Sequence, residues 1–326
     1  MSARCLSRLT PLPEEGYSRA ALARLSDNRK LPSRLRFSRE QLAGIRAAHS
    51  AHLSISGVQD KLSLRLHRGQ LEPVTTGGQF ILKPVPSALL PAYHGDIPAN
   101  EHLTMQLAEQ VFGVRTAANA LIRLADGELA YLTRRFDRTL DGDRLAQEDL
   151  CQVLRRSPDS HGPLYKYDSS YEALGAALKQ HCAAYAIEAE ELFLRIVFSY
   201  AVGNGDAHLK NFSLHPTPRG DHRLTPAYDL IASSLHLPNE PRLALDLFDH
   251  DELPDGVANE GFETGRDLLE LARRFGLRPH RAEATLRRFP AQRDAVADLV
   301  GRSFLSEPAK QAYLACFEDR VSALER

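Results

Sequence analysis

Alternating apolar and polar residues predict a small antiparallel sheet in the first half of the chain. Leu62, Leu64 and Leu66 alternate with polar residues, which is the period of a half-buried strand. Two more short apolar runs follow, "LEPVT" at 71–75 and "QFILK" at 79–83, and the turn sequences "HRGQ" and "TGG" separate the three runs. We therefore expect the three runs to form a three-stranded meander.

A different spacing predicts helices. Leu103, Leu107 and Val111 recur at every fourth position, and a glycine follows where such a helix should stop. Two strands expected at 119–125 and 128–136 are joined by an Asp–Gly pair, a strong hairpin signal. Beyond residue 138 the pattern is mainly helical, with helices expected at 170–182, 188–202, 265–275, 280–288, 292–304 and 308–324. The pattern thus predicts an α+β protein, with a small antiparallel sheet and one helix followed by a mainly helical half.

Composition narrows the class of protein. The chain has 326 residues, 43% hydrophobic and 25% charged, which is enough for about two domains or two lobes. No run reaches the roughly 20 apolar residues of a membrane span, and the N-terminus lacks the apolar core of a secretory signal. We therefore expect a cytoplasmic protein that does not bind membranes. Because its four cysteines are far apart and share no CxxC spacing, we expect reduced, packed thiols.

Charge is nearly balanced over the whole chain but unevenly distributed. Residues 1–50 carry ten Arg or Lys and four Asp or Glu, whereas residues 240–265 carry one Arg and eight acids. Either region could steer a charged partner, but solvated surface is the simpler interpretation. The basic region lacks interleaved aromatic residues and a helix-turn-helix pattern, so direct DNA binding is not expected.

The stretch richest in polar residues is "VGNGDAHLKNFSLH", directly after an apolar helix. Asp206 and Asn211 are five positions apart, with His208 and Lys210 between them. Eighteen residues further on, Asp229 is the only charge in the strand-like run "LTPAYDLIAS". A buried carboxylate needs a partner, and a divalent cation is one candidate.

Structural explanations for these residues remain open. Asp206 could cap a turn, and the residues that follow it could be ordinary loop polars. Asp229 could pair with an arginine instead of a metal. The histidines at 208, 215 and 222 could bind a metal, but their spacing fits no compact metal motif.

The order of the polar residues along the chain favours a phosphoryl-transfer enzyme. Gly57 lies in a polar turn, Lys83 ends a strand, and Glu101 lies on the next helix; the Asp–x4–Asn stretch and the second aspartate follow. Transfer from ATP uses a loop over the phosphates, a strand lysine oriented by a helix glutamate, a base, and two metal ligands. Lys83 could instead be an edge-strand charge, and Glu101 an acid that complements the helix dipole.

These motifs resemble the HipA-like serine/threonine kinases, the toxins of bacterial toxin–antitoxin systems. The chain contains "SISGVQDK", "FILKP", "NEH", "RRFDR", "QEDLCQVL", "GNGDAHLKNFSL" and "LTPAYDLIAS" in that family's order. The resemblance covers residues 54–234. It implies a two-lobed, protein-kinase-like α+β fold, with an N-terminal lobe at 1–138 and a helical C-terminal lobe at 139–326.

The resemblance also implies a role for each matching residue. Asp206 would be the catalytic base, and Asn211 and Asp229 would bind Mg²⁺. Residues Ser54 and Ser56 match serines that the family autophosphorylates. Binding of ATP would involve Ser56, Gly57, Val58, Gln59, Asp60 and Lys61 in a phosphate-covering loop, Lys83 with Glu101, the hinge residues Arg134, Arg135 and Phe136, and His208, Lys210 and Asn211. The loop carries a single glycine, so it matches neither a Walker motif nor a eukaryotic glycine-rich loop.

The short N-terminal region and the paired serines are similar to the HipT-type members of the family. That similarity implies a HipS-like protein that supplies a missing subdomain, and a HipB-like protein through which DNA is contacted indirectly. It also implies a protein substrate of the aminoacyl-tRNA synthetase class, with tryptophanyl-tRNA synthetase favoured, whose phosphorylation would block translation and growth.

Two other functions remain open, a small-molecule phosphotransferase and a non-catalytic nucleotide-binding regulator. The paired loop serines favour the protein kinase over the first. The intact set of lysine, two aspartates and asparagine disfavours the second.

Overall fold

The computed structural model describes residues 3–49, 60–139, 141–250 and 252–326. Its strands are β1 (Ala3–Arg4), β2 (Pro11–Leu12), β3 (Leu62–His67), β4 (Gln70–Pro73), β5 (Phe80–Lys83), β6 (Asn119–Arg123), β7 (Leu129–Arg134), β8 (Glu148–Asp149), β9 (Ser213–Pro216) and β10 (His222–Leu224). Its α-helices are α1 (Arg19–Ser26), α2 (Arg39–His49), α3 (Ile97–Gln110), α4 (Leu150–Val153), α5 (Pro158–His161), α6 (Tyr171–His181), α7 (Tyr185–Ala201), α8 (Asp255–Glu260), α9 (Gly265–Arg274), α10 (Pro279–Ala291), α11 (Arg293–Gly301) and α12 (Glu307–Leu324). Short 3-10 helices are η2 (His94–Asp96), η3 (Leu209–Asn211) and η4 (Ser233–Leu235).

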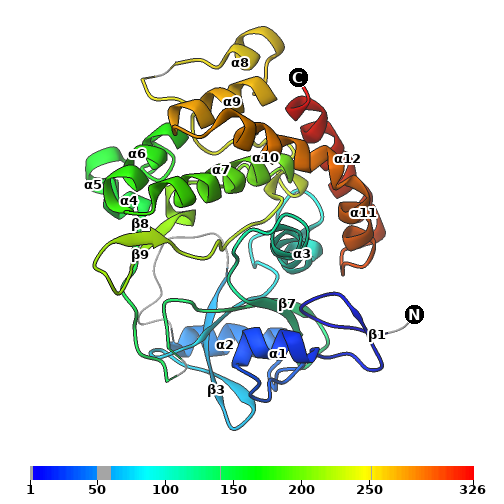
Figure 1. The fold of residues 1–326 in the computed structure, drawn as a ribbon. Helices are drawn as coiled ribbons and strands as arrows, with labels where there is room; N and C mark the ends of the chain where they lie inside the picture. The colour runs from blue at the N-terminus through cyan, green and yellow to red at the C-terminus, as the bar shows by residue number, and fades with distance from the viewer. Residues whose placement is uncertain (1–2, 50–59, 140, 251) are drawn as a thin grey trace.

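The protein has a sheet-containing part and a helical part. A five-stranded antiparallel sheet, in the order β4-β3-β5-β7-β6, lies with α1 and α2 at the bottom of Figure 1. Helices α4 to α12 form the upper part, and α3 lies between the two. The predicted α+β class, the antiparallel sheet and the mainly helical second half are confirmed.

The predicted meander is wrong, because β5 pairs with β3 and not with β4. A meander would put β4 between two neighbours, but Pro73 has no N–H to donate and suits an edge strand. The chain then crosses the end of β3 at Gly78, where an added Cβ would collide with Ser63. The predicted hairpin is confirmed, since β6 and β7 pair antiparallel around Gly127, whose φ is +96°.

All six helices expected after residue 138 are present, as α6, α7, α9, α10, α11 and α12. The pattern missed a small sheet in the order β10-β9-β8, since two to four residues per strand are too few to show a period. The strand-like reading of "LTPAYDLIAS" is also wrong. Apart from Leu224, which ends β10, and Ser233, which begins η4, this segment forms no strand or helix, and Asp229 adopts a φ of 54° that no strand residue has.

Two hydrophobic cores hold the molecule together. The smaller core lies between α1, α2 and the five-stranded sheet, and the larger one fills the helical part. Helix α3 contributes Leu103 and Leu107 to the larger core while it also contacts β6 and β7. Residues 97 to 108 are consequently all buried, although five of them are polar.

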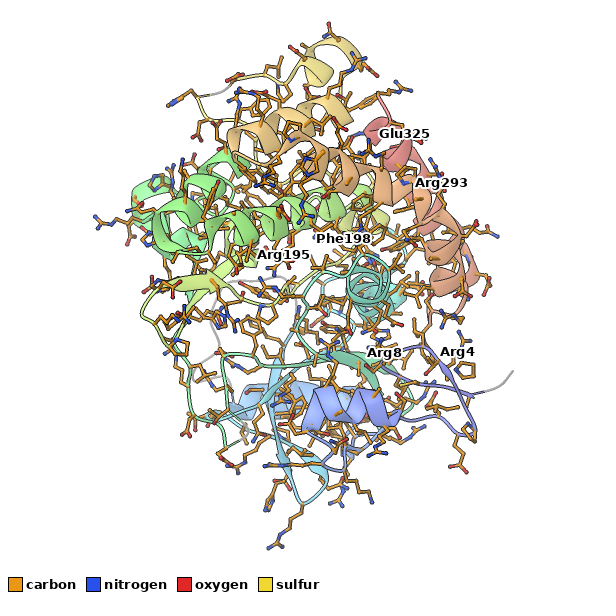
Figure 2. All side chains as sticks on the ribbon, viewed as in Figure 1. Arg4, Arg8, Arg195, Phe198, Arg293 and Glu325 are labelled. Carbon is orange, nitrogen blue, oxygen red and sulfur yellow. The ribbon has the colours of Figure 1, made fainter. Side chains whose placement is uncertain are left out.

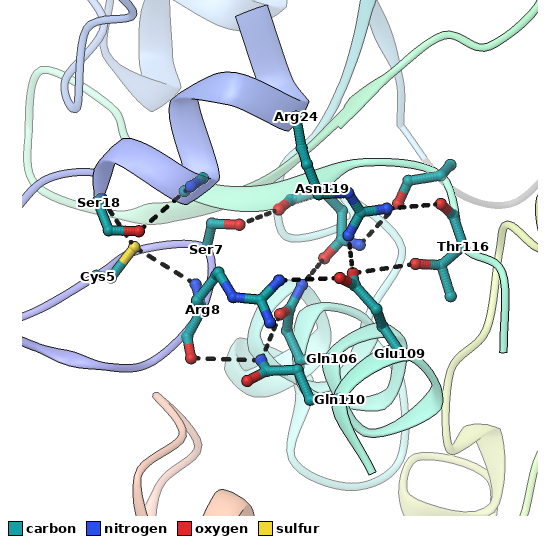
Figure 3. A network of polar contacts seen from close by, with 12 residues as sticks. Cys5, Ser7, Arg8, Ser18, Arg24, Gln106, Glu109, Gln110, Thr116 and Asn119 are labelled. Atoms are coloured by element: carbon teal, nitrogen blue, oxygen red, sulfur yellow. Dashed lines mark hydrogen bonds and ion pairs between the residues drawn. The ribbon is translucent and has the colours of Figure 1, made fainter. Parts of the chain in front are cut away.

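The N-terminal segment, residues 3–16, lies across the sheet and α3 (Figure 3). Ser7 donates a hydrogen bond to the carbonyl oxygen of Asn119 on β6, 2.7 Å away. Arg8 pairs with Glu109 on α3 at 2.9 Å, and Arg24 of α1 pairs with the same carboxylate. The basic residues of this region are therefore partly used in internal contacts, and are not all solvated surface as the sequence suggested.

The prediction for cysteines is confirmed, since all four are free and three are buried. Within the described ranges, no helix combines the length and the apolar character needed to cross a membrane.

Candidate active site

Lys83 contacts two acidic residues that are far from each other in the sequence. Its Nζ lies 2.6 Å from Oε1 of Glu101 on α3 and 2.7 Å from Oδ1 of Asp229. Lys83 and Glu101 are buried, whereas the Asp229 side chain is 47% exposed. Burial alone would lower the pKa of Lys83, but the two carboxylates raise it above its ordinary value. Lys83 is therefore a permanently charged ammonium group at the end of β5.

Asp229 is held in an unusual backbone conformation. Although its side chain is half-exposed, protein around the carboxyl raises the pKa of Asp229, but the charge and hydrogen bond of Lys83 lower this pKa more, so that the group stays ionised. A positive φ is uncommon for a residue other than glycine and persists only where the surroundings enforce it. One support is Arg195 of α7 (Figure 2), which is fully buried and donates to the carbonyl oxygen of Thr225 at 2.8 Å.

Asp206 lies in the turn that follows α7. Gly203 ends the helix with a φ of +70°, and an added Cβ would collide with Ser234. The Asp206 side chain is 43% exposed, and its Oδ1 accepts a hydrogen bond of 2.5 Å from the hydroxyl of Tyr167. His208 Nε2 lies 3.9 Å from the same oxygen. Burial lowers the pKa of His208, which makes it neutral at physiological pH.

Asn211 ends η3, and the loop that carries it is hydrogen-bonded to the segment that carries Asp229. The hydroxyl of Tyr228, which precedes Asp229, donates a hydrogen bond of 2.7 Å to the carbonyl oxygen of Lys210, which precedes Asn211. Oδ1 of Asn211 is buried and has no hydrogen-bond partner among the described residues. An amide oxygen and a carboxylate are ligands that Mg²⁺ accepts, with substrate phosphates and water completing its shell. The residues present therefore fit a Mg²⁺ ion that is shared with a nucleotide.

A metal cluster of histidines is not formed. His215 Nε2 accepts a hydrogen bond of 2.8 Å from Arg223. In the described ranges, no group of three or more His, Cys, Asp or Glu residues could hold a metal ion.

The expected phosphate-covering loop lies mostly outside the described residues, which exclude Ser54, Ser56, Gly57, Val58 and Gln59. Its last two residues, Asp60 and Lys61, are described. Asp60 Oδ2 accepts a hydrogen bond from the backbone N–H of Ser87 at 3.0 Å. Lys61 is an exposed residue, yet its pKa is lowered, mainly because protein surrounds its ammonium group. The negative charge of Asp229 raises this pKa, and the positive charges of Lys83 and Lys210 lower it. Lys61 thus lies within electrostatic range of the same charges.

The expected hinge residues separate in space. Arg134 pairs with Asp27 of the N-terminal region at 2.9 Å, and Arg135 pairs with Asp137 at 2.6 Å. Phe136 contacts a residue beside the candidate site, since its ring centroid is 5.4 Å from that of Tyr228.

Sequence reasoning missed Tyr167, which contacts the Asp206 carboxylate, and the residues around it. Lys166 accepts a backbone hydrogen bond from Leu209 at 3.1 Å, and Lys210 Nζ donates to the hydroxyl of Tyr165 at 3.4 Å. The segment "YKY" at 165–167 therefore lines the loop that carries Asp206. Its only signal in the sequence is two aromatic residues in an otherwise polar stretch.

Comparisons with known proteins identify the family of the chain. The protein-family model of the HipA-like C-terminal domain matches residues 53–296 of this chain. A putative kinase of Haemophilus influenzae is 28% identical over 340 residues, which cover 98% of this chain and 97% of that relative.

Two solved structures share the fold. HipA of Shewanella oneidensis, in a complex with HipB and operator DNA, has a TM-score of 0.62 and 23% identity; the match covers 84% of this chain and 65% of that one. The proinflammatory kinase CtkA of Helicobacter pylori has a TM-score of 0.53 and 14% identity over 81% of this chain and 90% of its own. At these identities the two structures show the two-lobed, kinase-like fold.

Proposed function

This chain belongs to the family of proteins with a HipA-like C-terminal domain, and from that premise we propose that it is an ATP-dependent serine/threonine kinase that acts as a toxin. The observation that carries the proposal is the contact of Lys83 with both Glu101 and Asp229, next to the loop of Asp206 and Asn211. Phosphoryl transfer needs these groups together. We also propose that the two lobes divide near residue 138.

The proposed reaction transfers the γ-phosphoryl group of ATP to a serine hydroxyl. A bond forms between the serine oxygen and phosphorus, the bond from phosphorus to the β-phosphate oxygen breaks, and ADP leaves. The serine proton passes to the carboxylate of Asp206, which is half-exposed and can be reached by a protein substrate. Lys83 and Lys61 would contact the nucleotide phosphates and offset their charge.

Asn211 and Asp229 would hold Mg²⁺, which neutralises the phosphate charge that develops during transfer. The unpartnered amide oxygen of Asn211 supports this assignment. Within the expected hinge, we propose that Phe136 contacts adenine and that Arg135 lies beside it. Arg134 would support the hinge from its ion pair with Asp27.

The finer proposals rest on the resemblance to HipT-type kinases. We propose autophosphorylation of Ser54 and Ser56, regulation by HipS-like and HipB-like proteins in the cytoplasm, and contact with DNA only through the HipB-like protein. The complex of the Shewanella HipA with HipB and operator DNA supports a HipB-like partner. As substrate we propose an aminoacyl-tRNA synthetase, with tryptophanyl-tRNA synthetase first.

Substitution Asp206→Asn tests the proposal, because an amide cannot accept the serine proton at the same geometry. We expect wild-type protein to incorporate label from γ-labelled ATP, with mass spectrometry finding phosphate on Ser54 or Ser56. The Asp206→Asn variant should fold normally and incorporate at least about a hundredfold less label.

Substitution of both serines by alanine is the matched control. It should remove self-labelling but retain measurable transfer to a purified synthetase, reduced to the extent that Ser56 contacts ATP. Undiminished labelling of Asp206→Asn would refute the assignment of the base. Labelling of a small metabolite and of no protein would favour the small-molecule phosphotransferase.

A further inference from the structure

Asn100, directly before Glu101 on α3, uses its whole hydrogen-bonding capacity on one distant segment and its own helix. Its Nδ2 donates to the carbonyl oxygen of Ala232 at 2.9 Å and contacts Nε2 of His236 at 2.9 Å. Its Oδ1 accepts from the backbone N–H of Ala232 at 3.2 Å and from the hydroxyl of Thr104 at 3.1 Å. An asparagine side chain offers two donors and two acceptor sites, and all four are used here at a fully buried position.

The directions of these hydrogen bonds are fixed by the chemistry of the partners. Nδ1 of His236 lies 3.0 Å from the carbonyl oxygen of Ala92, which can only accept. His236 therefore carries its proton on Nδ1, and its Nε2 accepts from Asn100. Since the hydroxyl of Thr104 donates to Asn100, the Tyr313 hydroxyl at 3.0 Å must donate to Thr104. The network has one consistent arrangement and extends to α12.

The segment that Asn100 holds, residues 232–236, also contacts the loop of the proposed base. Oγ of Ser233 accepts a hydrogen bond of 2.9 Å from the backbone N–H of Gly205, the residue before Asp206. The backbone N–H of Ser234 donates to the carbonyl oxygen of Gly203 at 3.0 Å. The same segment begins three residues after Asp229. It therefore connects, through a few bonds, the helix of Glu101, the loop of Asp206 and the strained backbone of Asp229.

We propose that Asn100 is a positioning residue that sets the Lys83–Glu101 pair in register with Asp229 and Asp206 through residues 232–236. Asn100 contacts none of the proposed reacting groups itself, so its effect on the reaction is indirect. This inference rests on the proposed kinase function. Its physical reason is that a shift of about 1 Å in a catalytic group can cost about a hundredfold in rate.

The test compares Asn100→Leu with Gln106→Leu. Gln106 is a matched control, because it is also a buried amide on α3, but it bonds to Asn119 and Gln110 and not to residues 232–236. Leucine has the branching and the number of side-chain heavy atoms of asparagine and one heavy atom fewer than glutamine, and each substitution removes a satisfied buried polar group. We expect the initial rate of label incorporation at saturating ATP to fall about 10- to 100-fold in Asn100→Leu and less than about threefold in Gln106→Leu.

Hydrogen exchange supplies a readout that does not depend on catalysis. Amides of residues 203–206 and 229–236 should exchange faster in Asn100→Leu and unchanged in Gln106→Leu. If Asn100→Leu does not fold, Ser233→Ala replaces it, with an expected loss of about 3- to 10-fold in rate and faster exchange at Gly205.

Equal rates for the two leucine variants, or unchanged exchange in residues 203–206 and 229–236, would overturn the inference. Wild-type protein that transfers no phosphate would instead overturn the proposed function. In that case the exchange measurement alone decides whether Asn100 holds the segment.

Discussion

At the scale of single residues, the buried contact between Lys83 and Glu101 affects both stability and activity. The side chains are 8% and 2% exposed. Lys83→Met removes the cation that this carboxylate contacts, and the loss of one partner from a buried pair costs about 3–5 kcal/mol. We expect the free energy of unfolding, measured in urea, to fall by about 3 kcal/mol.

The double variant Lys83→Met with Glu101→Gln supplies the control, because it also removes the buried negative charge. It should recover part of the lost stability, while neither variant transfers phosphate. If the double variant lost as much free energy of unfolding as the single variants Lys83→Met and Glu101→Gln lose together, this explanation would be contradicted.

Site residues could be predicted from the sequence only where the residue types and their order along the chain matched those of a known kind of site. The grouping of Lys83, Glu101 and Asp229 was expected from their order, and the structure brings them within hydrogen-bonding distance. The contacts of Asn100 and Tyr167 could not be predicted in this way. Asn100 lies in the "NEH" motif, but its partner and that of Tyr167 are 132 and 39 residues away in the chain, so no local pattern reveals these contacts.

At the scale of elements, α3 shows the same limit. Its apolar spacing predicted a helix, but not that polar residues on its other faces would also be buried. Burial of those faces depends on the N-terminal segment and α11, which pack against α3 from opposite ends of the chain. The order of β3, β4 and β5 likewise depended on the position of Pro73 in an edge strand, and the short apolar runs alone did not reveal this order.

His102 of α3 makes the stability of the fold depend on pH. It is fully buried and its Nε2 lies 2.7 Å from the carbonyl oxygen of Ser7. Burial lowers its pKa from 6.5 to about 4. Between these values the unfolded chain binds a proton that the folded chain does not, so stability falls as the pH falls from about 6.5 to about 4. One such group contributes a loss of about 3 kcal/mol over that range.

His102→Gln tests this effect, since the amide can still donate to Ser7 but does not titrate. Unfolding in urea at about pH 7 and about pH 4.5 should show a smaller loss of stability on acidification than in wild-type protein. Some dependence should remain, because burial also lowers the pKa of His208 and His236. An unchanged dependence on pH would contradict the role of His102.

At the scale of the whole molecule, the two ends of the chain stabilise the fold together. Arg4 donates to the carbonyl oxygens of Arg302 and Ser303 at 2.5 and 2.9 Å, and its guanidinium lies 5.1 Å from the ring centroid of Phe304. In return, Arg302 donates to the carbonyl oxygen of Leu9. The N-terminal segment thus joins the sheet and α3 to the link between α11 and α12. Such contacts span almost 300 residues, and sequence pattern cannot predict them.

Arg4→Met should therefore destabilise the molecule more than the loss of a surface ion pair does. Hydrogen bonds to a charged donor contribute about 1.5–3 kcal/mol each, and partial exposure reduces this, so we expect a loss of about 2 kcal/mol. Arg293 is the control (Figure 2), because it makes two ion pairs, to Glu318 and Glu325, and its contacts stay among α11, the end of α10 and the C-terminal end of the chain.

Arg293→Met should cost less than about 1 kcal/mol, as exposed ion pairs do. The measurement is the free energy of unfolding in urea, with an unchanged m value showing that the native and unfolded states remain comparable. A larger loss in Arg293→Met than in Arg4→Met would mean that the two ends of the chain contribute little to the stability of the fold. The expected order would mean that the N-terminal segment, by contacting both α3 and the last two helices, keeps the helix of Glu101 fixed against the helical lobe.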